Sequence, residues 1–449
     1  MNKALRKGVV IVAILAVTLF AGCIDELPIQ TPAPSLTPTP ASAPPLSPTP
    51  SSLSSKSSAT LSPSPPSKEA PIIIHNQNIS GEIEQDQIWS GTIHVTGDIW
   101  VCEEVILTII PGTTVLISAG RDDQNKGQSL IAEEPEKMGP LYTEEYAKTH
   151  VEIVGRIIAV GTSDNMIKFT SDSPTPNYAD WSEIRLYPDS RIEYSIIEYS
   201  GRAGIGWQGP PLPKNANISV SNNIIRHIFL GGIVLGPGSW KVVSNNISDC
   251  GSEGIAVDPL AGKPYIAGNI VSNSTVGIAT LSESSSIIEN NLLIDNVKGI
   301  VSRANDTIRN NYISSPNREI HEQSYMGYTF PYIVEPGVIT FIGIQIAENP
   351  TVTIDFNEIV NNQRGTAIGP GSKPTLTLRN NNINDNDLNI YSDAAATINA
   401  PNNWWGTTNT SEVDAKIWDY YDNPSLGKIN YAPILYAPIE EAGIRKIKN

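Results

Sequence analysis

The segment GGIVLGPGSWKVVSNNISDCGSEGIAVDPLAGKPYIAGNIVSNSTVGIAT, which runs from Gly231 to Thr280, contains the same pattern three times. Each copy has Gly followed by Ile, and Ile233, Ile255 and Ile278 are 22 and 23 residues apart. The spacing continues on both sides, in the series Ile205, Ile233, Ile255, Ile278, Ile300, Ile344, Ile368 and Ile390. Self-similarity at a period of about 20–50 residues is the signature of a repeat protein.

A second series runs out of phase with the isoleucines and ends on asparagine. In each member an aliphatic residue stands three positions before Asn: Val220 and Asn223, Val243 and Asn246, Ile266 and Asn269, Ile288 and Asn291, Ile308 and Asn311, Ile354 and Asn357, and Leu378 and Asn381. One step, from Asn311 to Asn357, measures 46 residues, which is twice the period. Either an extra coil or a long loop therefore occupies that interval, around residues 314–339, and residues 120–150 form another interruption.

The composition of each repeat predicts strands and no helices. Short aliphatic runs such as Gly232–Leu235 and Gly254–Val257 are separated by Asn, Ser and Gly, and no apolar stripe at helical spacing is long enough for a helix. A leucine-rich repeat would need Leu at several fixed positions, which this chain lacks. We therefore predict an all-β fold, a single-stranded parallel β-helix. In it Ile255 stacks on Ile278, and the series asparagines occupy sharp turns and bond to one another along the axis.

The first 71 residues predict export and attachment to a membrane. Basic residues at positions 3, 6 and 7 precede an apolar run that ends at Ala21, and Cys23 follows, a pattern similar to a lipoprotein signal peptide. We predict a signal peptide over residues 1–22, a lipid on Cys23, and a disordered stalk rich in Pro, Ser and Thr over residues 23–71. An uncleaved N-terminal anchor is the alternative. In both cases the protein is exported and anchored at the outer face of the cell membrane or at the cell surface.

The remaining chain is predicted to form one solenoid. The β-helix is expected over residues 72–436, with opening coils at 72–200, repeats at 201–400 and a closing coil at 401–436, followed by a tail at 437–449. A solenoid has no globular size limit, so one domain of this length is acceptable. The net charge of −16 argues against a nucleic-acid partner, because binding to phosphates needs basic surface. We expect a monomer.

Cysteine and histidine indicate neither a disulfide nor a metal. Beyond Cys23, only Cys102 and Cys250 remain, and several coils should separate them, whereas a disulfide needs Cα atoms within about 7 Å. The histidines are isolated and lack the ligand spacing of a zinc site: His75, His94, His150, His227 and His321. No cofactor is therefore expected.

Three segments resemble right-handed parallel β-helix surface proteins of bacteria and archaea. GTIHVTGDIWVCEEVILTIIPGTTVLIS (91–118) and GRIIAVGTSDNMIKFTSD (155–172) are similar to their opening coils, and NNWWGTTNTSEVDAKIWDYYDNPSLGKINYAPIL (402–435) is similar to their terminal coil. The repeats between resemble the domain shared by carbohydrate-binding proteins and sugar hydrolases, and NosD-like periplasmic proteins. The resemblance implies a right-handed β-helix but no single activity, because the family includes lyases, hydrolases and binding proteins.

Reading across the repeats at a fixed offset from the series asparagine gives one polar strip. It contains Arg226, His227, Asp249 and Asp295, which are the weak catalytic candidates of this chain. Two coils would hold the carboxylates of Asp249 and Asp295 about 9–10 Å apart, near the spacing of an inverting glycosidase. The alternative is that these are turn residues, where Asp and Asn are common.

Aromatic residues gather in the second interruption. Tyr325, Tyr328, Phe330 and Tyr332 lie close together in sequence, and such rings stack on sugar faces while tyrosine hydroxyls bond to sugar oxygens. We predict that these four residues contact a glycan. The alternative is that they pack the loop against the solenoid.

Other features follow from position in the repeat. Trp404 and Trp405 are expected to cap the last coil, since the end of a solenoid needs a cover. Asp258 is expected to face outwards, and Asn246 to be inaccessible inside the ladder. Sequons permit N-glycosylation at five further sites: Asn78, Asn217, Asn273, Asn305 and Asn409.

Three functions agree with this pattern. The first is a surface lipoprotein, anchored to the membrane through Cys23, that binds a glycan or another envelope polymer without catalysis. The second is a polysaccharide lyase or glycoside hydrolase, with Ca²⁺ as a cofactor in the case of a lyase. The third is a structural adhesin or spacer. The sparse polar strip favours the first, and a cleft with several ionisable groups in adjacent coils would favour the second.

Overall fold

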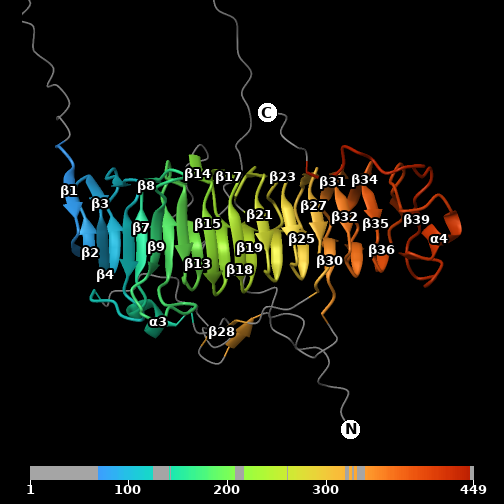
Figure 1. Cartoon of the computed structure of the whole chain (residues 1–449). Coiled ribbons are helices and arrows are strands. Elements are labelled where there is room, and N and C mark those ends of the chain that lie inside the picture. The colour runs from blue at the N-terminus through green and yellow to red at the C-terminus, as the bar shows by residue number, and fades with distance from the viewer. Residues whose placement is uncertain are drawn as a thin grey trace, which may run out of the picture.

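The chain forms a long solenoid of stacked parallel strands (Figure 1). The computed structural model describes residues 69–124, 141, 143–207, 217–259, 261–318, 323–325, 328–330 and 339–444. The predicted signal peptide, the stalk up to residue 68 and Cys23 lie outside the described residues. Strands pair in parallel with the strands one coil before and one coil after, so the predicted right-handed parallel β-helix is confirmed. In the part of the chain just defined, no helix is both long and apolar enough to cross a membrane.

Each coil contributes a strand to three faces, which follow one another along the chain and are called A, B and C. Face A is a 12-stranded sheet of β1 (Ile72–His75), β3 (Gln87–Ser90), β5 (Leu107–Ile109), β8 (Ile157–Val160), β11 (Arg191–Glu193), β14 (Asn217–Ser221), β17 (Ser239–Val243), β20 (Tyr265–Ala267), β23 (Ile287–Glu289), β26 (Thr307–Arg309), β31 (Thr351–Asp355) and β34 (Thr375–Arg379).

Faces B and C merge into a 23-stranded sheet. Face B holds β6 (Thr114–Ile117), β9 (Ile167–Ser171), β12 (Ser195–Glu198), β15 (Ile224–Ile228), β18 (Asn246–Cys250), β21 (Ile270–Ser272), β24 (Leu292–Ile294), β27 (Tyr312–Ser314), β32 (Glu358–Val360) and β35 (Asn382–Asn384). Face C holds β7 (Glu152–Gly155), β10 (Glu183–Leu186), β13 (Ala203–Trp207), β16 (Gly231–Leu235), β19 (Glu253–Val257), β22 (Val276–Thr280), β25 (Lys298–Ser302), β30 (Ile342–Ile346), β33 (Arg364–Ile368), β36 (Leu388–Ser392) and β38 (Ile417–Trp418). In the first two coils, β2 (Asn78–Ile83) and β4 (Thr92–Val101) run through both faces.

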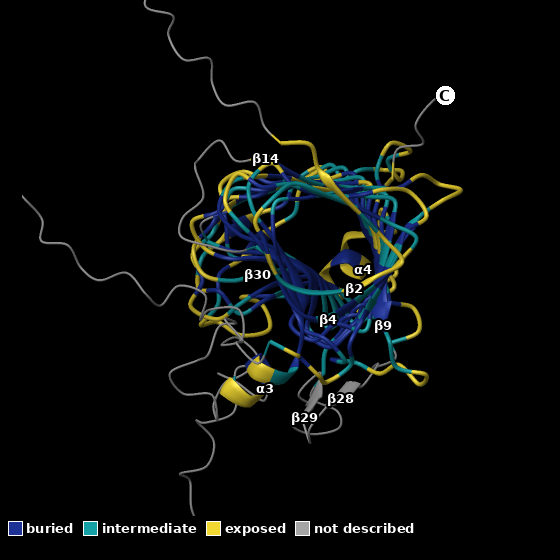
Figure 2. Ribbon diagram, turned by 90° about the vertical axis from the view of Figure 1, so that its left-hand side faces the viewer, coloured by how far each residue is buried: buried dark blue, intermediate teal, exposed yellow. Residues whose placement is uncertain are grey.

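The isoleucine series lines the interior of face C. Ile233, Ile255, Ile278 and Ile300 are paired coil to coil, and each is 0% exposed. The predicted stacking of Ile255 on Ile278 is therefore confirmed. Seen along the axis (Figure 2), buried residues line the inside of the tube, and exposed residues lie on its turns.

One member of the predicted isoleucine series is wrong. The pairing of β30, β33 and β36 places Thr366 between Ile344 and Ile390, and Ile368 pairs with Ile346 two positions further along the strand. Both Thr366 and Ile368 are buried, so hydrophobicity alone selected the wrong one.

Glycine precedes the inward isoleucine because any larger residue would collide with the next coil. A Cβ atom on Gly232, Gly254 or Gly277 would lie 2.5, 2.9 or 2.6 Å from the carbonyl oxygen of the next glycine in the series. This glycine ladder consists of Gly204, Gly232, Gly254, Gly277, Gly299, Gly343 and Gly365. Glycine is therefore required at these positions so that neighbouring coils can approach each other along the axis.

The asparagine series forms a hydrogen-bonded ladder at the AB edge, the turn between faces A and B. Asn269 Oδ1 accepts from both the backbone N and the Nδ2 of Asn245, each at 3.0 Å, and Asn269 Nδ2 donates to Asn291 Oδ1 at 3.0 Å. The ladder runs through Asn223, Asn245, Asn269, Asn291, Asn311, Asn357, Asn381 and Asn403. Each rung satisfies polar groups that would otherwise be buried without partners.

The predicted ladder is wrong at Asn246, because the second rung is Asn245. Each ladder asparagine follows a residue in the left-handed conformation, and here that residue is Ser244, with φ 58°. Val220 consequently pairs with Val242 and not with Val243. Asn246 is an exposed residue of β18, so the expectation that it is inaccessible is also wrong.

The 46-residue interval is a loop and contains no extra coil. Strand β25 pairs directly with β30, β26 with β31, and β27 with β32, so the coils on either side are adjacent. Within the loop, β28 (Gln323–Tyr325) and β29 (Tyr328–Phe330) pair as an antiparallel hairpin. The first interruption carries α3 (Glu144–Thr149), which is capped by Thr143.

The last coil is closed by α4 (Thr410–Asp414) and by the paired strands β37 (Ile398–Asn399) and β39 (Ile429–Asn430). Trp405 is 3% exposed within the core and meets the Tyr431 ring edge-on at 6.3 Å. Trp404 is half-buried beside Asn382. The capping role expected of this tryptophan pair is therefore confirmed for Trp405.

Asp258 and both described cysteines are buried or partly buried. Asp258 is 5% exposed, so the expectation that it faces solvent is wrong; it begins the connection from face C to face A, where the backbone turns back on itself. Cys250 is buried in the core, Cys102 is partly buried against the core in the opening coils, and both are free thiols.

Candidate binding edge

The BC edge, the turn between faces B and C, is where the solenoid is least regular. Most of its connections contain two to four residues, but three are long: 118–151, 172–182 and 315–341. Figure 1 shows α3 and β28, from the first and third of these, on the same side of the solenoid. Long connections on a rigid scaffold are where binding residues concentrate.

The predicted polar strip lies along this edge, and three of its four members, His227, Asp249 and Asp295, have a left-handed backbone. The strip positions have a left-handed backbone, with φ between 51° and 70°, at Tyr199, His227, Asp249, Asn273, Asp295, Asn361 and Asp385. Asn and Asp tolerate this conformation, which explains why they dominate the column. The backbone of His227, Asp249 and Asp295 therefore agrees with the turn interpretation, whereas Arg226 lies within β15 and does not share this conformation.

Two strip residues and one residue from a long connection form a compact cluster. His227 Nδ1 lies 2.5 Å from Asp249 Oδ2, and the hydroxyl of Tyr178 donates to the same oxygen at 2.6 Å. A carboxylate only accepts hydrogen bonds, so this contact places the proton of neutral His227 on Nδ1. The His227 side chain is 37% exposed, and its Nε2 then presents an acceptor.

Aromatic rings enclose the imidazole. Tyr199 stacks on His227 with ring centroids 5.3 Å apart, and Tyr178 meets it edge-on at 6.1 Å. Tyr199 and His227 both have a left-handed backbone, with φ 70° and 56°, which large side chains adopt with strain. Tyr199 and His227 thus depart from the preference of these turn positions for Asn and Asp, and such departures mark candidate functional positions.

Tyr178 is held in place by a small second core under the long connections. It packs against buried Leu141, Tyr146, Ala179 and Phe229, which join the first two long connections to the BC edge. Burial and the hydrogen bond to Asp249 raise the pKa of Tyr178 well above its usual range. Tyr178 therefore stays a neutral donor at physiological pH. Its sequence neighbourhood gave no signal for this contact, because 71 residues separate it from Asp249.

The other two catalytic candidates have structural partners. Arg226 donates from Nε and Nη2 to Glu198 Oε2, at 3.0 and 2.9 Å, and Lys168 binds the other oxygen at 2.7 Å. Asp295 accepts from the backbone N and the Nδ2 of Asn317, at 3.1 and 2.7 Å. Asp295 thus anchors the start of the third long connection.

The carboxylates of Asp249 and Asp295 do not form an acid pair. Strand pairing places their turns two coils apart, as predicted, but each carboxylate is bound to its own partners on the BC edge. A glycosidase of either stereochemistry needs two carboxyl groups that flank one bond. The structure brings His227 and Asp249 together and leaves Arg226 and Asp295 apart from them.

The aromatic candidates of the third connection are only partly described. Tyr325 and Tyr328 are opposite each other in the hairpin, and Phe330 is opposite Gln323. Tyr332 lies outside the described residues. Of the sequons, Asn78, Asn217, Asn305 and Asn409 are exposed, and Asn273 is half-buried on the BC edge.

The chain is similar to a protein family and to a solved structure. A model of the NosD family, described as periplasmic copper-binding protein, matches residues 184–330, so the predicted resemblance to NosD-like proteins is confirmed for that region. The crystal structure of the Dettilon tailspike protein matches with 15% identity and a TM-score of 0.40, covering 72% of this chain and 62% of the tailspike chain. This chain therefore spans less than two thirds of that relative. The search of curated proteins finds no match.

The described residues of the matched region do not fit a copper site. Copper prefers imidazole and soft sulfur ligands, and in this region the described candidates are His227 and Cys250. His227 Nδ1 is bound to Asp249, and the Cys250 thiol lies inside the core. Across the described ranges, no three His, Cys, Asp or Glu side chains are placed to hold a metal ion. His321 and Met326 lie outside those ranges.

Proposed function

We propose that this chain is an exported β-helix protein, tethered to a membrane through Cys23, that binds a glycan or another envelope polymer at its BC edge without cleaving it. The observation that carries the proposal is the cluster of Tyr178, Tyr199, His227 and Asp249 at the irregular edge. Rings beside exposed acceptors match a sugar, which has apolar faces and hydroxyl groups.

The position of this cluster supports a polymer ligand. It spans four consecutive coils, those of β9, β12, β15 and β18, and strands of neighbouring coils are about 4.8 Å apart. A polymer that lies along the axis can therefore contact several coils at once. The hairpin residues Tyr325, Tyr328 and Phe330, and Tyr332 two residues later in the sequence, belong to a connection of the same edge and are proposed as further contacts.

The state of the carboxylates supports binding without cleavage. Asp249 and Asp295 are each bound by neighbouring side chains, which leaves no pair for general acid and base catalysis. One observation favours the enzyme alternative: an imidazole whose Nδ1 is fixed by a carboxylate can act as a base through Nε2. A lyase or hydrolase is therefore the second candidate, and a structural adhesin or spacer is the third.

Incubation of the purified protein with a polysaccharide panel tests the proposal. We expect retention of at least one polymer and no new reducing or unsaturated ends. Tyr199→Ala and Tyr328→Ala should each weaken retention by about 1–3 kcal/mol, the scale of losing a stacked ring. Tyr436→Ala, which removes a ring that is 82% exposed near the end of the chain, is the matched control and should have no effect. Turnover that Asp249→Asn abolishes would establish the enzyme instead.

Membrane attachment has its own test. Cells that express the protein are labelled with a lipid precursor, and the wild-type chain should incorporate it. Cys23→Ser should abolish labelling, because the thiol is the acceptor. Labelling of the Cys23→Ser variant would refute attachment at this residue.

A further inference from the structure

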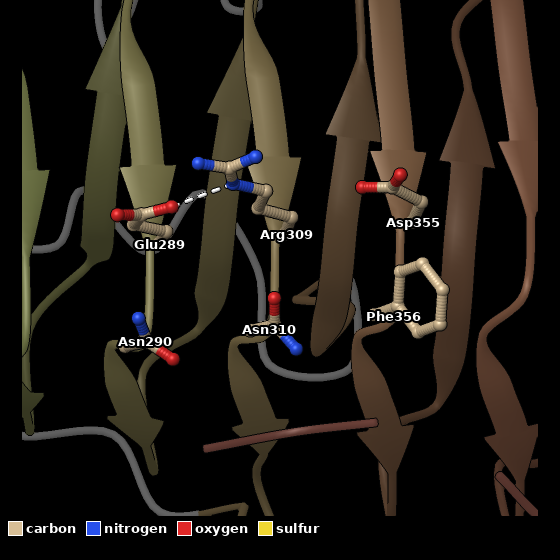
Figure 3. A pocket seen from close by; sticks show the side chains of 6 residues that line it. All are labelled: Glu289, Asn290, Arg309, Asn310, Asp355 and Phe356. Carbon is tan, nitrogen blue, oxygen red and sulfur yellow. Dashed lines mark hydrogen bonds and ion pairs between the residues drawn. The ribbon is translucent and has the colours of Figure 1, made fainter. Parts of the chain in front are cut away.

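A pocket of about 280 Å³ lies at the AB edge, away from the long connections. Figure 3 shows its lining as two rows that cross three consecutive coils, those of β23, β26 and β31. The first row is charged and consists of the last residues of three face A strands: Glu289, Arg309 and Asp355. The second row consists of the residues that follow them in the turn: Asn290, Asn310 and Phe356.

Phe356 is an unusual residue type for its position in the turn. The residue before each ladder asparagine has a left-handed backbone, and Asn290, Asn310 and Asn380 have φ of 55°, 54° and 56° there. Phe356 adopts the same conformation with φ 54°, although an aromatic side chain does so with strain. The strain places a ring beside five polar side chains of the pocket.

Two of the three charged side chains, those of Glu289 and Arg309, are held in place by hydrogen bonds. Glu289 accepts from the hydroxyl of Tyr265 at 2.6 Å and from Arg309 Nε at 2.5 Å. Arg309 makes this bond through Nε, so its terminal amino groups are further donors at the pocket. Asp355 follows Arg309 one coil later in the same row.

The C-terminal segment is hydrogen-bonded to two residues of the pocket lining, Asn310 and Phe356. Ile439 N donates to Asn382 Oδ1 at 2.8 Å, Asn310 Nδ2 donates to Glu441 O at 3.1 Å, and Gly443 N donates to Phe356 O at 2.8 Å. These bonds carry residues 439–443 back along the AB edge across several coils. The pocket is thus built from three coils, and the C-terminal segment is bound beside it.

We infer that this pocket binds one neutral sugar unit of a glycan. The lining combines planar carboxylate, amide and guanidinium groups, which bond to neighbouring hydroxyls, with one aromatic ring for the apolar face of a sugar. Its volume suits a monosaccharide, since pockets for larger, drug-sized ligands occupy about 300–1,000 Å³. Two carboxylates against one guanidinium disfavour an acidic sugar, because like charges would be brought together.

Titration of the purified protein with neutral monosaccharides and with the matching uronic acids, followed by NMR or calorimetry, tests the inference. We expect saturable binding of a neutral sugar and at least about tenfold weaker binding of the uronic acid of the same ring. Asp355→Asn and Phe356→Ala should each weaken the neutral sugar at least about tenfold. The matched controls are Glu193→Gln and Tyr194→Ala, which alter the same two positions of an earlier coil outside the pocket, where Tyr194 also has a left-handed backbone, with φ 48°.

The outcomes separate this site from the BC edge. Loss of binding in Phe356→Ala or Asp355→Asn, with Tyr199→Ala unchanged, supports the pocket even if no polymer is retained at the BC edge. Three results would overturn it: no saturable binding of any neutral sugar, equal losses in the Glu193 and Tyr194 controls, or loss in Tyr199→Ala with no loss in the pocket variants.

Discussion

In the opening coils, the position before the inward isoleucine of face C carries Glu152 and Glu183, whereas in the repeats it carries glycine. Strand pairing shows that the positions are equivalent, because Ile153, Ile184 and Ile205 are in register. Glycine in the repeats has no side chain, so neighbouring coils can approach each other closely. The opening coils keep a charged side chain and bury it under the first long connection.

The buried charges of the opening coils are balanced by arginines. Arg185 binds Glu152 through Nη2, and its Nε lies 3.6 Å from Glu183. Arg202 Nη1 lies 3.8 Å from Glu183, and its Nε donates to Leu141 O at 2.8 Å in the covering connection. Burial raises the pKa of Glu183, against the opposing effect of these two arginines. The same fold therefore accepts either an empty position or a paired charge, but not an unpaired one.

The largest effect is expected when an unpaired charge is placed in a repeat. Ile255→Asp puts a carboxylate at a position that is 0% exposed and surrounded by aliphatic side chains. The cost should be several kcal/mol, enough to lower the midpoint of thermal unfolding sharply or to prevent folding. Ile270→Asp, at a position of β21 that is 42% exposed, is the control and should fold normally. An unchanged melting curve for Ile255→Asp would refute the interior assignment.

A smaller loss is expected when the empty position of a repeat is filled. Gly277→Ala would bring a Cβ atom within 2.6 Å of the Gly299 carbonyl, and the coils would have to separate. We expect a loss of about 2–3 kcal/mol, as for other overpacked sites. Gly369→Ala is the matched control, because its nearest contact would be 3.5 Å. Denaturant unfolding compares the two, and equal stabilities would contradict the requirement for space along the axis.

The ladder that distinguishes the repeats can be tested at two adjacent asparagines. Asn245→Ala removes a rung and leaves the backbone N and the Nδ2 of Asn223 without their acceptor. The loss should be about 2 kcal/mol, the scale of unsatisfied buried groups. Asn246→Ala changes an exposed neighbour and should alter stability by less than about 0.5 kcal/mol. A larger loss of stability in Asn246→Ala than in Asn245→Ala would show that Asn246 is the ladder residue.

Asp98 should in turn give the opening coils a pH-dependent stability. Burial, followed by repulsion from Glu152, raises the pKa of Asp98 to about 8. The native state keeps this proton while the unfolded state releases it, so stability falls as pH rises from about 4 to about 8. Between pH 6.5 and 8 the loss should be about 1–2 kcal/mol.

Asp98→Asn should make that slope shallower. The amide oxygen can still accept from Glu152 N, a bond of 2.8 Å in the wild type. The pH window avoids His150, whose pKa is lowered to about 4 by burial and which therefore costs stability only as pH falls below 6.5. Urea unfolding across pH 6.5–8 measures the slope, and an unchanged slope in the variant would show that Asp98 is not its source.

The repeat itself could be read from the sequence because a coil imposes strict local demands. Inward positions such as Ile255 and Ile278 must be aliphatic, and the residues before them must be small. The AB turn must contain a left-handed residue followed by a ladder asparagine. Each of these requirements recurs in every coil. The period, the fold class and the core of face C can therefore be read from the sequence alone. The sequence failed where two nearby residues met the same demand, as at Asn245 and Asn246, and where a buried polar residue replaced the expected aliphatic one, as at Thr366.

The binding sites could be predicted only in part, since the chemistry joins residues of different coils and of long connections. Sequence analysis found His227 and Asp249 because they share a repeat position, but it missed Tyr178, which lies outside the repeat register and meets them through the second core. It also missed the pocket, because Glu289, Arg309 and Phe356 belong to three different coils and form one lining only when those coils stack. The periodic sequence determined how one coil stacks on the next. Which side chains meet across coils was decided by tertiary structure, because those contacts follow no period.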